Sequence, residues 1–320
     1  MSKSNTFNHS LIIVTLLLLI FSVLSYGKEI IHEKIEYTPL GNLLKAVPSE
    51  FLSEVIEIPI QNPEPFIAIG LNATLSNENE NTHFYIRVSE DGDSWSDWQL
   101  VESDDDAGKI ENKFLGTLAF FDKNTKLMQF RTNVFPNLEE LTFNFISPGR
   151  TDKDKIKNRI EQSQLIKTID TIERPEFVSR KNWGCPQDEH VSARSLTSVT
   201  HLIIHHSAGN TVASDYGAVV LAYWSYHVNG HGWDDIGYNW LVDPNGVLYK
   251  GRAWQTPTAE NVRGAHNSGK NSNTAGICFI GLYTSTIPSD IGLNKIATIA
   301  AFLSNKYGIN PEGESYHDAI

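Results

Sequence analysis

A charged and polar segment divides the chain into two differently patterned parts and constrains the fold more than any other feature. Residues 151–175 carry Lys, Asp, Glu and Gln throughout, which is typical of a linker, helical between residues 153 and 169. Before this segment, short apolar runs alternate with turn sequences; after it, strand-like and helix-like runs alternate. A chain of 320 residues is long enough for two domains with separate cores.

The first part is predicted to be a β-sandwich. Short strand-forming runs recur between residues 29 and 149 without a helical period. Turn sequences such as Glu90-Asp91-Gly92-Asp93 favour hairpins between them. Residues 104–106 form an acidic cluster without the spacing of a calcium loop, so we interpret it as a solvated loop. The expected strands are 55–60, 66–73, 82–88, 98–101, 114–121, 127–132 and 141–146.

The second part is predicted to be a mixed α/β domain. Residues 213–228 have apolar and aromatic side chains at helical spacing, and residues 291–307 form an amphipathic pattern closed by Gly308. Strand patterns occur at 236–241, 247–251 and 275–283. This alternation favours a mixed central sheet flanked by helices.

The stretch Thr-His-Leu-Ile-Ile-His-His-Ser at residues 200–207 contains the first candidate metal ligand. Its apolar run is too short for a helix and is typical of a strand buried on both faces. The run ends in His205 and His206, whose side chains point to opposite faces of a sheet. One of them can therefore face a cleft and begin a metal site; the alternative is two surface histidines.

The net charge and the N-terminal sequence indicate where the protein is located and which partners it does not bind. A formal net charge of −12 argues against nucleic acid or an anionic membrane surface as the partner. Residues 11–24 are apolar and are followed by Ser25-Tyr26-Gly27, the pattern of a secretory signal peptide. The run is shorter than the ~18 apolar residues of a membrane span. We therefore expect cleavage near Gly27, with no stable span afterwards, and an exported protein that is periplasmic or extracellular.

Four segments of the second part, residues 201–209, 232–252, 264–266 and 271–281, occur in a fixed order. Together they resemble the peptidoglycan recognition protein family, which includes the zinc-dependent type 2 N-acetylmuramoyl-L-alanine amidases. The resemblance extends over residues 175–307. With the patterns described above, the expected division is a signal peptide (1–27), a sandwich-like accessory domain (28–150), a linker (151–175) and an amidase domain (176–320).

The resemblance implies roles for individual residues. It implies that His205 is the first zinc ligand, that Tyr238 lies beside the zinc, and that His266 is a cleft histidine without a ligand role. Trp233 could line a glycan groove. Asn271 would bind the peptide stem or hold its own loop through side-chain to backbone hydrogen bonds. The implied cofactor is Zn²⁺, and the implied partner is peptidoglycan in the cell wall.

The chemistry of these residue types suits cleavage of the amide between N-acetylmuramic acid and L-alanine. Zinc polarises an amide carbonyl and lowers the pKa of bound water to ~7. A phenol such as that of Tyr238 can donate a hydrogen bond to the oxyanion that forms. A peptidoglycan-binding protein without catalysis is the alternative, because the family also contains members that keep the groove and lose a ligand.

Other polar residues near these motifs have simpler interpretations. Asp234 and Asp235 could act on protons, but their place before a strand favours turn roles. His227 and His231 flank a helix end, where imidazole can cap carbonyls.

A catalytic zinc site also needs further ligands. About three protein ligands are expected, and His317 is the candidate second ligand although its polar approach is unlike a strand. We expect the natural chain to continue past Ile320 to the missing ligands, and the 320-residue chain to hold zinc poorly.

Overall fold

The computed structural model describes residues 30–38, 44–47, 50–77, 82–104, 107–108, 110–134, 137–152, 156, 172–209 and 215–314. The expected signal peptide, nearly all of the expected linker helix, and His317 lie outside these residues. None of the described helices is long and apolar enough to cross a membrane.

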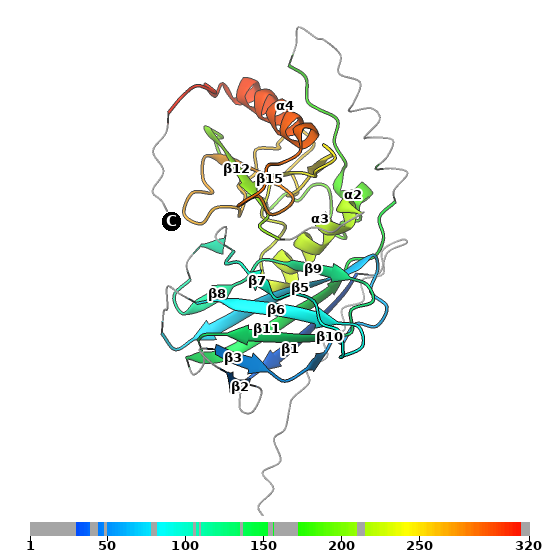
Figure 1. Cartoon of the computed structure of the whole chain (residues 1–320). Coiled ribbons are helices and arrows are strands. Elements are labelled where there is room, and N and C mark those ends of the chain that lie inside the picture. Colours follow the sequence, from blue (N-terminus) through cyan, green and yellow to red (C-terminus); the bar gives the residue numbers. More distant parts are fainter. Residues whose placement is uncertain are drawn as a thin grey trace, which may run out of the picture.

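Two antiparallel sheets form the first part, so the predicted all-β architecture is confirmed (Figure 1). The large apolar side chains of both sheets meet in one core between them, which contains Ile69, Phe84, Phe130 and Phe143. The first sheet has the order β1 (Ile31–Tyr37), β11 (Leu138–Ser147), β5 (Phe66–Leu75) and β8 (Lys113–Leu115), with β9 (Ala119–Asp122) also paired to β5. The second has the order β2 (Leu44–Val47), β3 (Glu50–Ser53), β10 (Leu127–Thr132), β6 (Phe84–Ser89) and β7 (Gln99–Val101), with β4 (Ile56–Glu57) paired to β10.

The second part is a four-stranded mixed sheet between two helices, as predicted. The sheet has the order β12 (His201–His206), β15 (Thr274–Phe279), β13 (Trp240–Val242) and β14 (Leu248–Lys250), and only the β13–β14 pair is antiparallel. Alternate strand residues pack on α4 (Asp290–Tyr307) on one face and on α3 (Tyr216–Ser225) on the other. The described part of the chain also contains α2 (Arg180–Trp183) and the π-helix η2 (Tyr226–Gly230).

Strand β12 is an edge strand, which corrects the expectation that it is buried on both faces. It pairs only with β15, at one end of the sheet. Ile204 is 55% exposed. The β-branched residues of this run therefore indicate a strand but do not indicate that the strand is buried.

The two parts of the chain share a core around α3. The helix sequence Tyr-Gly-Ala-Val-Val-Leu-Ala-Tyr-Trp-Ser is apolar on all sides, and a helix of this kind is buried all round. Its second side packs on the first sheet of the sandwich, where the rings of Phe120 and Tyr223 lie 5.7 Å apart between centroids. Figure 1 shows α3 between the sandwich and the third sheet. Cys185 and Cys278 are both buried, and no disulfide joins them.

Candidate functional site

The ring nitrogens of His205 are oriented by a hydrogen-bond chain at the end of β12. The Nε2 atom of His205 lies 3.0 Å from Nδ1 of His266. The Nε2 atom of His266 in turn lies 3.4 Å from Oγ1 of Thr274. That hydroxyl donates its own hydrogen to the carbonyl of Lys270, so it can only accept from His266. His266 therefore carries its proton on Nε2 and accepts from Nε2–H of His205. In this arrangement Nε2 of His205 is held by His266, and Nδ1 is the nitrogen that can bind a metal.

Asn271 holds the loop that carries His266. Its Oδ1 atom accepts hydrogen bonds from the backbone N–H groups of His266 (2.7 Å) and Asn267 (3.0 Å). The ring of His266 is fully buried against Gly276, where a Cβ atom would lie 2.4 Å from its Cγ. The loop-holding interpretation of Asn271 thus describes a contact that the structure contains.

Tyr238 and His205 share a cavity of about 270 Å³. Tyr238 is only 4% exposed, and its ring centroid lies 6.0 Å from that of His205 and 5.8 Å from that of His227. Trp233 and Asn271 line a different pocket, of about 450 Å³, whose wall also contains three arginines. His205 and Tyr238 therefore line one pocket, Trp233 and Asn271 line another, and the buried His266 lines neither.

Asp235 fixes the segment that leads into Tyr238. Its carboxylate lies 3.0 Å from the guanidinium groups of both Arg180 and Arg194, and all three side chains are buried. It also accepts from the backbone N–H groups of Ile236 and Ala253. The sequence predicted only a turn role for Asp235. Its ion pairs with two arginines could not be predicted, because the sequence around a turn does not show which distant arginines will contact it.

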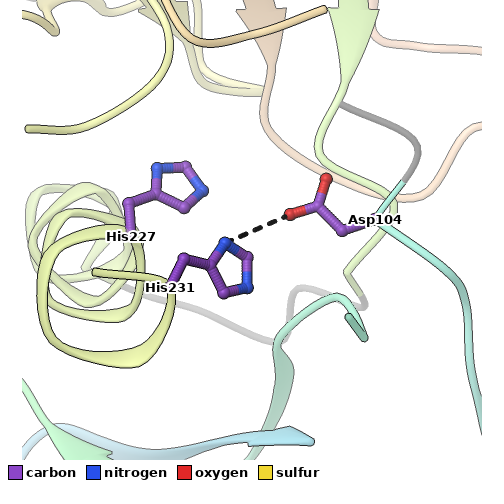
Figure 2. Close-up of side chains that lie close together, drawn as sticks. All are labelled: Asp104, His227 and His231. Carbon is purple, nitrogen blue, oxygen red and sulfur yellow. Dashed lines mark ion pairs between the residues drawn. The ribbon is translucent and has the colours of Figure 1, made fainter. Parts of the chain in front are cut away.

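A cluster of Asp104, His227 and His231 lies beside the cavity (Figure 2). The donor atoms lie within 4.8 Å of one another, and this is the one such group of three among the described residues. The Asp104 carboxylate is 3.9 Å from Nδ1 of His231 and only 10% exposed. The interpretation of residue 104 as part of a solvated loop was therefore wrong, because the sandwich lies against the second part at this point.

The donor set of this cluster fits a metal poorly. The backbone N–H of Gly237 donates to Nδ1 of His227 at 3.1 Å, so the ring proton is on Nε2 and blocks that nitrogen. Burial lowers the pKa of His227 well below its usual value and lowers the pKa of His231 to about 4, so both rings are neutral at pH 7. The His-x-x-x-His spacing of His227 and His231 is visible in the sequence. No sequence signal near these residues indicates that Asp104 lies beside them.

Comparison with known proteins identifies a family model and several relatives of this chain. Residues 195–320 match the family model described as N-acetylmuramoyl-L-alanine amidase. The chain is 38% identical over 123 residues to Peptidoglycan-recognition protein SC2 of Drosophila simulans, covering 35% of this chain and 59% of that protein.

Two further relatives are Peptidoglycan recognition protein 1 of Bos taurus and the N-acetylmuramoyl-L-alanine amidase of Mus musculus. The first is 35% identical over 130 residues, covering 39% of this chain and 64% of that protein. The second is 32% identical over 152 residues, covering 43% of this chain and 27% of that protein. This chain thus spans less than two-thirds of the length of each of the three relatives.

Proposed function

Because residues 195–320 belong to the peptidoglycan recognition protein and type 2 amidase family, we propose that this protein is an exported zinc amidase. Its substrate is peptidoglycan, and the bond it hydrolyses joins N-acetylmuramic acid to L-alanine. The observation that carries the proposal is the position of His205, held through Nε2 by His266, in one cavity with Tyr238. The same proposal includes cleavage near Gly27 and the division of the chain into residues 28–150, 151–175 and 176–320.

His205 would hold the zinc through Nδ1. When bound, the ion would polarise the substrate carbonyl and supply hydroxide at neutral pH. Within the described ranges His205 belongs to no group of three metal-binding side chains. His317, which the structure does not describe, stays the candidate for the second position.

Tyr238 and His266 would act as fixed groups around the reacting amide. The phenol of Tyr238 would donate a hydrogen bond to the oxygen on which negative charge develops, and a buried donor is stronger than one in water. His266 would accept from Nε2–H of His205 and so keep the imidazole in one orientation and one tautomer.

Replacing Tyr238 with Phe tests the enzyme directly. The change removes one hydroxyl, so we expect an intact fold and a turnover number lowered by roughly 10²–10³-fold. Hydrolysis of a muramoyl peptide is measured with added zinc, with Tyr37→Phe in the sandwich as the matched control. Activity of the wild type should also disappear with a chelator. A Tyr238→Phe variant that works at full rate would contradict the role of Tyr238.

A peptidoglycan-binding protein without catalysis is the second candidate. It is favoured by relatives that are named as recognition proteins, and among the described residues His205 is in no group of three metal-binding side chains. Binding to insoluble peptidoglycan without any hydrolysis in added zinc would support this candidate and exclude the enzyme.

A further inference from the structure

The β-sandwich supplies part of the wall of the cavity that contains His205 and Tyr238. Four residues of its loops line that cavity together with residues 204–208 and the π-helix. The four are Ser103, Asp104, Thr117 and Leu118.

Close backbone packing fixes this wall in place. The hydroxyl of Tyr226 donates to the carbonyl of Gly116 at 2.7 Å. Its ring covers Gly70, where a Cβ atom would lie 2.4 Å from the ring. A Cβ atom at Gly209 would lie 2.5 Å from the carbonyl oxygen of Leu118. These contacts hold the sandwich loops against the cavity at distances that larger side chains would not allow.

The wall is acidic at one point. Asp104 is the one acidic side chain among the lining residues, and they include no lysine or arginine. The neighbouring rings of His227 and His231 are neutral because burial lowers the pKa of both. The side chain of His231 is fully buried behind this wall and does not line the cavity. The end of the cavity at Asp104 therefore has a negatively charged acceptor and no lining cation, which suits a ligand group that donates hydrogen bonds or carries positive charge.

We propose that Asp104 is a specificity-determining residue whose carboxylate binds an ammonium or N–H group of the peptide stem. The sandwich is then part of the substrate site as well as a neighbour of it. The inference rests on the proposed function, because it takes a muropeptide as the ligand. An uncrosslinked stem presents such an ammonium on the side chain of its diamino acid. A metal ion is the less suitable occupant, since Nε2 of His227 carries a proton.

The test compares two soluble muropeptides that differ only in the stem amine, which is free in one and N-acetylated in the other. Dissociation constants are measured by calorimetry on the full chain, in the Tyr238→Phe background so that the ligand survives. We expect Asp104→Asn to weaken binding of the free amine by about tenfold and to leave the acetylated fragment nearly unchanged. Asp97→Asn, an exposed change on the same sandwich, should alter neither constant.

Other outcomes separate the possible failures. Equal weakening of both fragments, or no weakening, would overturn the inference while the proposed function stood. Loss of one equivalent of zinc from Asp104→Asn would make Asp104 a metal ligand and overturn it as well. If Asp104→Asn lowers the melting temperature, Asp104→Glu decides, because it keeps the charge and should keep part of the preference for the free amine. A parent chain that binds neither fragment, tested with an intact Tyr238, would end both the proposed function and this inference.

Discussion

The interaction of one carboxylate with two buried arginines gives the sharpest prediction at the scale of single residues. Replacing Asp235 with Ala would leave the guanidinium groups of Arg180 and Arg194 without their shared partner in a buried place. We expect the free energy of unfolding to fall by about 3–5 kcal/mol. The neighbouring Asp234 also meets Arg194, but its side chain is 74% exposed.

Urea unfolding of both alanine variants measures the difference. Because solvent screens the exposed carboxylate of Asp234, Asp234→Ala should cost no more than ~1 kcal/mol. Similar losses for the two variants would show that burial does not decide the strength of this network.

Local motifs made some site residues predictable and left others hidden. His205 and Tyr238 stand in short segments whose order along the chain indicated a shared site, and the structure brings them into one cavity. Asp104 reaches the same cavity from a loop of the sandwich. Its acidic neighbours in the sequence indicated a solvated loop, because nothing within a few residues reports a contact made by the fold.

Among the secondary-structure elements, the contact of β1 with α3 depends on a neutral histidine. His32 on β1 lies 2.9 Å from Oγ of Ser225 through Nδ1 and 3.0 Å from Oδ1 of Asn144 through Nε2. Burial lowers the pKa of His32 to about 4, below its ordinary value of 6.5. The unfolded chain therefore takes up this proton first, and the stabilisation present above pH 6.5 is lost as the pH falls toward 4.

The free energy of unfolding should decrease across that interval by up to ~3 kcal/mol for this group, at about 1.4 kcal/mol per pKa unit. Denaturant titrations at several pH values measure the slope. The His32→Gln variant should show a shallower one, while His231, whose pKa is also lowered to about 4, keeps its own contribution in both proteins. A steeper slope in the variant would contradict the assignment.

Elements with a strong pattern were predicted well, and elements defined by their partners were not. The expected helix at 291–307 is α4 (Asp290–Tyr307), and the expected strand at 127–132 is β10. The sequence Ile-His-Glu-Lys-Ile-Glu-Tyr of β1 is too charged to indicate a strand, and pairing with β11 along its whole length overrides that composition. The expected strand at 114–121 is divided into β8 and β9.

For the whole molecule, the sequence indicated a β-sandwich and an α/β part but not their common core. The helix α3 is apolar on every side, which predicts burial without saying what covers each side. The helix packs on the four-stranded sheet of the second part and also on the sandwich. The sandwich contributes Phe66, Phe120 and Ile146 to this contact. The sequence of a helix does not show which distant part of the chain will pack against it.

This shared core predicts that the second part does not fold alone. A chain that begins at Arg174 would expose the side of α3 that packs on the sandwich, and Tyr226 would lose its bond to Gly116. Each large apolar side chain left exposed costs about 1.5–3 kcal/mol, against a total stability of about 5–15 kcal/mol for a typical domain. We therefore expect the shortened chain to aggregate or to lose its cooperative unfolding transition, as measured by size-exclusion chromatography and circular dichroism.

Adding residues 28–150 as a separate chain should restore part of the transition, since the missing surface is then supplied. A soluble, cooperatively folded fragment with the peptidoglycan affinity of the full chain would show instead that the sandwich is a detachable module.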